Sequence, residues 1–84
     1  MNKKILVTGC AGFIGFSTSK VLLKKGYKIY GIDNLNDYYS VKLKKDRIKE
    51  LYKINKSFKF YKIDISNEKK ISNLFKKLKI YKVL

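Results

Sequence analysis

Short apolar runs alternate along the chain with longer amphipathic stretches. Ile5, Leu6 and Val7 are consecutive, which is typical of a strand buried on both faces of a parallel sheet. A later run contains Lys59 and Lys62, and charge at such positions favours an edge strand. The pattern predicts strands at residues 3–8, 28–33 and 58–63, and the start of a fourth at residues 80–84.

The amphipathic stretches between these runs predict three helices, at residues 12–25, 41–54 and 67–78. Gly26 stands where a helix usually ends, and Ser66 is a suitable N-cap for the third helix. Polar residues 34–40 indicate a loop. The side chains expected to face inward are Ile14, Thr18, Val21 and Leu22 in the first helix, Val41, Ile48, Leu51 and Tyr52 in the second, and Ile71, Leu74, Phe75 and Leu78 in the third.

The order of elements is therefore β-α-β-α-β-α-(β). Strands that alternate with helices indicate an α/β fold with parallel pairing and right-handed crossovers. This is the order of the first, mononucleotide-binding half of a Rossmann fold. We expect residues 1–84 to form one such domain, which stops near the start of its fourth strand.

Composition narrows the possible classes of protein. The chain has 84 residues, of which 45% are hydrophobic, enough for one small core. It has one Cys and no His, which argues against a disulfide framework and a zinc site and removes the commonest general base. The apolar run before Cys10 is shorter than a signal sequence needs, and none approaches a membrane span. We expect a cytoplasmic protein without membrane contact.

The charge is strongly positive, with 21 Lys and Arg against 6 Asp and Glu, a net charge of +15. Such a balance allows a nucleic-acid-binding module as an alternative function. Every basic residue except Arg47 is a lysine, and the lysines are scattered. Base-reading interfaces favour arginine, so most of these lysines are better explained as solvated helix faces.

Residues 8–15 read TGCAGFIG and lie between a predicted strand and a predicted helix. In that context Gly9 permits a tight turn, Gly12 allows close approach of a diphosphate, and Gly15 allows the helix to pack on the strand. Amides near Phe13 and Ile14 would then face the phosphates at the positive end of the helix. The alternative is a helix whose glycines serve packing alone.

Two acids follow later strands. Asp33 comes 18 residues after Gly15, close to the spacing at which an acid binds the adenosine ribose and favours NAD over NADP. Asp64 and Ile65 follow the third strand and could contact adenine. The alternatives are a turn at Asp33 and an Asx or capping role for Asp64 before Ser66.

The spacing Thr8-Gly9-x-x-Gly12-Phe13-Ile14-Gly15 together with Asp33 resembles the extended short-chain dehydrogenase/reductase family of NAD-dependent sugar epimerases and dehydratases. Residues 31–39, GIDNLNDYY, and the following Val41-Lys42-Leu43-Lys44-Lys45 with Arg47 are similar in particular to UDP-glucuronate 4-epimerases. UDP-glucose epimerases and sugar-nucleotide dehydratases share the same cofactor half and remain alternatives.

The resemblance implies NAD as cofactor and a nucleotide sugar as substrate of the full-length enzyme, which is a homodimer in this family. It implies that Asp33, Asn34, Asn36 and Tyr38 surround the ribose, and that Asp64 and Ile65 touch adenine. The resemblance covers only the first quarter of such an enzyme, so we expect an N-terminal fragment that lacks the substrate domain.

The same resemblance implies a catalytic Tyr-x-x-x-Lys pair beside a Ser or Thr. The chain has this spacing at Tyr38…Lys42 and Tyr52…Lys56. Both lie between the second and third strands, on the adenosine side, whereas the pair must stand beside the nicotinamide. We therefore expect no catalytic residue in this chain, no metal site, and no epimerase activity from residues 1–84 alone.

Overall fold

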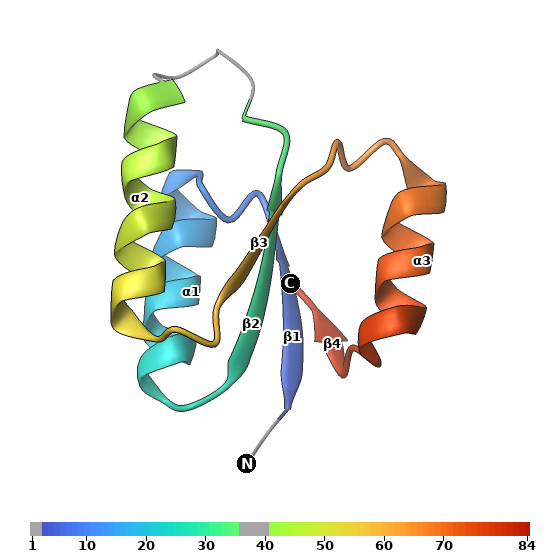
Figure 1. Ribbon diagram of the computed structural model, residues 1–84, viewed down its shortest axis with the longest axis horizontal. Coiled ribbons are helices and arrows are strands. Elements are labelled where there is room, and N and C mark those ends of the chain that lie inside the picture. Colours follow the sequence, from blue (N-terminus) through green and yellow to red (C-terminus); the bar gives the residue numbers. More distant parts are fainter. Residues whose placement is uncertain (1–2, 36–40) are drawn as a thin grey trace.

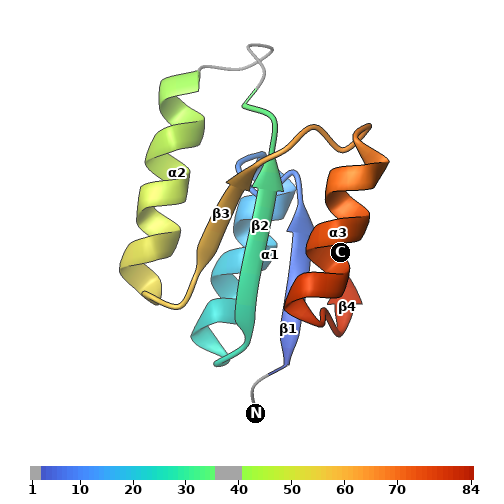
Figure 2. The same ribbon diagram turned by 45° about the vertical axis from the view of Figure 1, so that its right-hand side comes forward.

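In the computed structural model, four parallel strands form a sheet with helices on both faces (Figures 1 and 2). The structure describes residues 3–35 and 41–84. The elements are β1 (Lys4–Thr8), α1 (Phe13–Lys24), β2 (Lys28–Asp33), α2 (Val41–Ile54), β3 (Lys59–Lys62), α3 (Glu68–Leu78) and β4 (Lys82–Val83). The predicted α/β fold, a parallel half of a Rossmann fold, is confirmed, and each element lies within a few residues of its predicted range.

The sheet order is β3-β2-β1-β4. The chain moves outward from β1 to β2 and β3, then crosses to the other side of β1 to form β4. Ile5 pairs with Ile29 on one side of β1 and with Lys82 on the other. The strand order thus reverses at β1, and parallel sheets bind ligands beyond the carboxyl ends of the strands at such a point. As predicted, β3 is an edge strand.

The core has a layer on each face of the sheet. Ile5 and Val7 point toward α1 and α2, where they join a cluster that includes Leu51 and Phe58. Leu6 lies between them in sequence and points to the opposite face, which α3 covers (Figure 1). The consecutive apolar residues of β1 are therefore buried on both faces, as the sequence predicted.

The face of α1 that packs on the sheet differs from the prediction. Ile14 is 78% exposed and Val21 is 52% exposed, whereas Ser19 and Leu23 are buried. Gly15 causes the difference, because its backbone lies directly against that of Gly9. The residues one and two turns after Gly15 therefore face the sheet, and the larger apolar side chains beside it turn outward.

Smaller corrections apply to α2 and α3. Tyr52 lies on the surface, where its hydroxyl accepts a hydrogen bond of 3.0 Å from the Phe60 N–H, while Lys44 is buried instead. Asn67, not Ser66, caps α3, because its side chain accepts from the Lys70 N–H at 3.1 Å. Phe75 is exposed on the otherwise inward face of α3.

The end of α1 follows the prediction: Gly26 has φ +93°, the left-handed conformation that favours glycine after a helix. Within the described ranges, no helix has both the length and the apolar character needed to cross a membrane.

Candidate functional site

The carboxyl ends of β1 and β2 lie side by side, and each is followed by a predicted site residue. Thr8 is paired with Ile32, so the loop that starts at Gly9 leaves the sheet beside Asp33. The N–H of Cys10 donates to the carbonyl of Ile32 at 3.1 Å and continues the pairing into the loop. The register thus brings the glycine loop and the acid together at one edge of the sheet.

Gly9 and Gly15 have the backbone roles that the sequence predicted, whereas the role predicted for Gly12 concerns a bound diphosphate and stays a prediction. Gly9 adopts φ +62°, and its carbonyl accepts a hydrogen bond of 3.0 Å from the Gly12 N–H, which closes a tight turn. A Cβ on Gly15 would collide with the carbonyl group of Gly9, and a Cβ on Gly12 would lie 3.3 Å from the same oxygen. A side chain at position 15 would therefore require the backbone of Gly9 to move, and one at position 12 would require a smaller shift.

The first turn of α1 presents amides to the open edge of the sheet. Gly12 is the N-cap, so no side chain caps the helix, and the first turn has no acid. Within the described part of the chain, the amides of Phe13, Ile14 and Gly15 have no hydrogen-bond partner. Unpaired amides at the positive end of a helix favour an anion.

Asp33 is buried, 6% exposed, and its carboxylate connects three parts of the chain. Oδ2 accepts from the Ala11 N–H at 3.2 Å, while Oδ1 accepts from the Leu35 N–H at 2.8 Å and from Lys44 Nζ at 3.3 Å. Lys44 is itself only 5% exposed, so this ion pair is shielded from water. Asp33 therefore lies at the rim of the glycine loop, with its charge balanced by α2.

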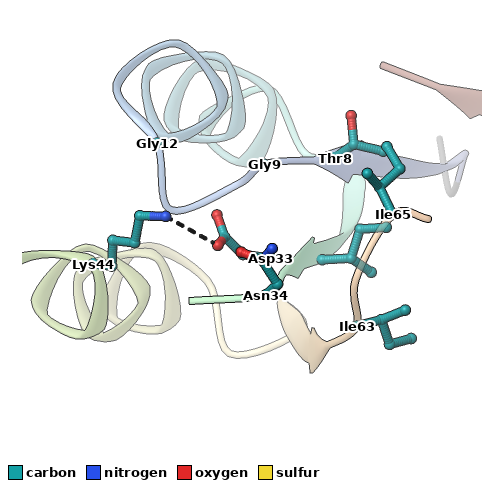
Figure 3. A pocket seen from close by; sticks show the side chains of 9 residues that line it. Thr8, Gly9, Gly12, Asp33, Asn34, Lys44, Ile63 and Ile65 are labelled. Carbon is teal, nitrogen blue, oxygen red and sulfur yellow. Dashed lines mark hydrogen bonds and ion pairs between the residues drawn. The ribbon is translucent and has the colours of Figure 1, made fainter. Parts of the chain in front are cut away.

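A pocket of 340 Å³ opens between the glycine loop and the end of β3, and we call it the β2-side pocket. Figure 3 shows Asp33 and Lys44 on one side of it, with Ile63 and Ile65 opposite. The pocket thus combines a carboxylate with apolar side chains, which suits a ribose attached to a flat base. Its lining residues are Thr8, Gly9, Gly12, Ile32, Asp33, Asn34, Lys44, Ile63 and Ile65.

A second pocket, of 710 Å³, lies on the other side of the loop, and we call it the β4-side pocket. It is lined by Val7, Thr8, Gly9, Gly12, Phe13, Ile14, Gly15, Thr18 and Leu84. The two pockets share Thr8, Gly9 and Gly12, so they meet at the glycine loop. An extended ligand could occupy both pockets with its centre beside the free amides of α1.

The structure separates the two predicted adenine contacts. Ile65 lines the β2-side pocket, but Asp64 is absent from the described residues that line it. The Oδ1 atom of Asp64 accepts from the N–H of Ser66 at 2.9 Å and from its hydroxyl at 2.8 Å, the Asx turn considered as an alternative. These hydrogen bonds, with one from Asn34, lower the pKa of the Asp64 carboxyl. Asn34 lines the β2-side pocket, while Asn36 and Tyr38 lie outside the described residues.

Two site residues, Lys44 and Arg47, were not predicted from the sequence. Lys44 shares a helix face with Ile48 and Leu51, at spacings of four and seven residues, and this spacing was the one available signal. Arg47 is the only arginine, and its Nη1 donates to the carbonyl of Ala11 at 3.0 Å. Nothing in the sequence indicates a backbone carbonyl as the partner of Arg47.

Cys10 lies inside the loop and is fully buried. Burial, with a smaller contribution from the Asp33 carboxylate, raises the pKa of its thiol to about 12. The thiol is protonated at neutral pH and packs against Gly31, where an added Cβ would lie 2.6 Å from the sulfur. Cys10 therefore serves packing and is not a nucleophile.

The chain is similar to known proteins over nearly its whole length. The family model described as GDP-mannose 4,6 dehydratase matches residues 6–84. A UDP-glucuronate 4-epimerase from Thermodesulfobacterium geofontis is 48% identical over 79 residues, which cover 94% of this chain and 24% of that protein. The chain spans about a fifth to a quarter of the length of the curated relatives it matches.

Solved structures show the same similarity. A mutant UDP-glucuronic acid 4-epimerase from Bacillus cereus, in complex with NAD and UDP-4-deoxy-4-fluoro-glucuronic acid, is 43% identical with a TM-score of 0.68 over 76% of this chain and 20% of that one. The UDP-Glc/GlcNAc 4-epimerase from Campylobacter jejuni is 32% identical with a TM-score of 0.81 over 96% of this chain and 23% of that one.

Proposed function

The chain belongs to the GDP-mannose 4,6 dehydratase family, the NAD-dependent epimerases and dehydratases that its glycine spacing resembled, and from this premise we propose that it binds NAD at the glycine loop. One observation supports the proposal most directly: Oδ2 of Asp33 accepts a hydrogen bond of 3.2 Å from the Ala11 N–H, beside the free amides of α1. The arrangement unites an acceptor for ribose hydroxyls with donors for a diphosphate.

The residues divide between the parts of the dinucleotide. The adenosine occupies the β2-side pocket, with Ile65 against the base and Asp33 and Asn34 beside the ribose. Among the described residues, Oδ2 of Asp33 accepts only from the Ala11 N–H, which leaves a lone pair for a ribose hydroxyl. The family resemblance further implies Asn36 as a ribose contact and Asp64 as an adenine contact, the latter through the carboxylate oxygen that Ser66 does not engage.

The diphosphate lies against the amides of Phe13, Ile14 and Gly15, which Gly9 and Gly12 leave open to its approach. The nicotinamide then extends toward the β4-side pocket. Both pockets touch the glycine loop, so one extended molecule can fill them together. The bound nicotinamide would accept a hydride from the sugar C4 position and return it.

We propose a nucleotide sugar as the substrate of the whole protein, with UDP-glucuronate favoured by the Thermodesulfobacterium and Bacillus relatives. The Campylobacter structure keeps UDP-glucose-type sugars as the alternative. The whole protein would be a homodimer, as the family resemblance implies. The free, buried thiol of Cys10 suits the reducing cytoplasm.

Residues 1–84 supply the cofactor site and no proton-transfer pair in this proposal. Of the two Tyr-x-x-x-Lys spacings, Tyr38 lies outside the described residues. The hydroxyl of Tyr52 accepts from the Phe60 N–H at 3.0 Å, and its ring packs on Phe58. Tyr52 therefore stabilises the junction of α2 and β3 and is unsuited to proton transfer at the glycine loop.

Calorimetric titration of the chain with NAD tests the proposal. We expect saturable binding that Asp33→Asn weakens at least about ten-fold, or about 1.4 kcal/mol. Asp46→Asn is the matched control, because Asp46 is an exposed acid that pairs only with Lys42 among the described residues. Circular dichroism of both variants verifies that they are folded.

Three results would contradict the proposal. The first is the absence of NAD binding by the folded chain. The second is binding to duplex DNA with a steep salt dependence and no competition by NAD, which would support the nucleic-acid alternative. The third is turnover of UDP-glucuronate by residues 1–84. This result would contradict only the statement that these residues supply no proton-transfer pair.

A further inference from the structure

Two basic side chains of α2 reach across to the glycine loop from one face of the helix. Arg47 donates to the Ala11 carbonyl at 3.0 Å, and Lys44, one turn earlier, donates to Asp33 at 3.3 Å. Asp33 in turn accepts from the Ala11 N–H. Ala11 is therefore held at both its N–H and its carbonyl by side chains from outside the loop.

This double attachment matters because Ala11 directly precedes the N-cap of α1. The direction of the free amides of Phe13 and Ile14 depends on the backbone at Gly12, which has no side chain to restrain it. A hydrogen bond at Ala11 removes this freedom before any ligand arrives. Donors fixed in advance bind an anion better than donors that must first be ordered.

We propose that Arg47 is a positioning residue for diphosphate binding, which fixes the Ala11 peptide so that the amides of α1 face the phosphates. The inference rests on the proposed NAD site. Arg47 has no part in contacting the ligand itself. It acts through the Ala11 carbonyl, from the helix on the far side of the loop.

The chemistry of the side chain suits this role. Arg47 is the only arginine among 21 basic residues, and its half-buried guanidinium also lies 5.7 Å from the centre of the Phe16 ring. A planar guanidinium can donate in its plane while its face lies over a ring. The Lys20 ammonium also lies over the Phe16 ring, at 5.1 Å, but an ammonium lacks the planar fork that fixes the direction of donation. The ring and the carbonyl together define one position for the group.

General packing of α1 against α2 does not depend on Arg47. Lys20 and Glu50 form an ion pair of 3.1 Å between the same two helices. Leu23 of α1 and Leu51 of α2 are buried in one core cluster. Glu50→Gln is therefore a matched control, because it removes this ion pair between the helices and leaves both the loop and the Phe16 ring untouched.

The test compares binding of adenosine and ADP by calorimetry in the 84-residue chain. Adenosine fills the β2-side pocket and leaves the amides of α1 free, whereas ADP also engages them. We expect Arg47→Met to weaken ADP binding about ten-fold and adenosine binding less than two-fold, with Arg47→Lys in between. Glu50→Gln should change neither affinity more than two-fold.

The possible results are distinguishable. Equal losses for adenosine and ADP, or no loss for ADP, in Arg47→Met would overturn the positioning role and leave the NAD proposal intact. If Arg47→Met fails to fold by circular dichroism, Arg47→Lys decides in the same way. Failure of the unmodified chain to bind ADP would overturn the proposed function and this inference together.

Discussion

Asp33 and Ala11 are 22 residues apart in the sequence and are joined by a buried hydrogen bond of 3.2 Å between the Asp33 carboxylate and the Ala11 N–H. The bond connects the end of β2 to the loop that follows β1. It therefore ties the two parts of the chain that the proposed site assigns to ribose and to phosphate. A substitution that breaks this hydrogen bond should therefore weaken binding of both the ribose and the phosphates.

The ion pair of Asp33 and Lys44 should contribute strongly to stability once one partner is removed. Lys44→Met leaves the Asp33 carboxylate buried without its cation, and we expect the free energy of unfolding to fall by about 3–5 kcal/mol. The double variant Asp33→Asn with Lys44→Met removes both charges and should recover part of the loss. Urea unfolding followed by circular dichroism measures the three proteins. Equal stability of Lys44→Met and the unmodified chain would contradict the buried pair.

Gly15→Ala should damage the loop far more than Gly26→Ala. The new Cβ would meet the Gly9 carbonyl group, and backbone cannot move aside cheaply, so we expect a loss of at least about 2 kcal/mol. Gly26→Ala is the control, since Gly26 has open space around it and only its φ of +93° opposes a side chain. That variant should lose about 1 kcal/mol and keep its NAD affinity. Thermal unfolding and calorimetry separate the two effects, and a Gly15→Ala chain with unchanged stability would be the contrary result.

The N-cap of α3 can be tested by paired variants. Asn67→Ala removes the acceptor for the Lys70 N–H and should cost about 1 kcal/mol. Ser66→Ala removes only the hydroxyl donor to the exposed Asp64, and we expect a much smaller change. Chemical unfolding of the two variants measures the difference. The reverse order of stabilities would restore Ser66 as the cap.

The buried thiol of Cys10 predicts a loss of stability at alkaline pH. Burial raises its pKa from 9.0 to about 12, so between these values the unfolded chain releases the thiol proton and the folded chain keeps it. The free energy of unfolding should fall by at most about 1.4 kcal/mol per pH unit in that window, with no contribution from Cys10 below it.

Cys10→Ala provides the reference for this effect, because the two proteins share every ionisable group except the Cys10 thiol. The difference in stability between the two proteins should shrink as the pH rises from 9 to 11. A difference that stays constant would show that the thiol titrates normally in the fold.

Much of the fold follows from local patterns in the sequence. The consecutive Ile5, Leu6 and Val7 predicted a strand buried on both faces, and Gly26 predicted the end of α1. These features depend on neighbours in sequence, so short patterns contain them. The glycine spacing likewise predicted the tight turn at Gly9 and the close packing of the helix at Gly15, which the structure shows against the backbone of Gly9 at the end of β1.

The errors arose where a distant contact decided the outcome. Ile14, Val21 and Leu22 form an apolar stripe, but the contact between Gly15 and Gly9 rotates α1 so that Ser19 and Leu23 are buried. Leu22 still packs against the core, as predicted, whereas Ile14 and Val21 are exposed. Lys44 of α2 is buried because its ion pair with Asp33 of β2 offsets the cost of its desolvation. Arg47 donates to the backbone carbonyl of Ala11. Every residue has a backbone carbonyl, so the sequence does not indicate which one an arginine will contact.

The proposed NAD site depends most on the amides of Phe13, Ile14 and Gly15, which would bind the diphosphate. Titration of the ¹⁵N-labelled chain with NAD, followed by amide resonances in NMR spectra, observes these groups individually. We expect saturable shifts that are largest at these three amides and also present at Asp33 and Asn34. Shifts spread over the lysine-rich surfaces of α2 and α3, with the three amides unmoved, would contradict the account.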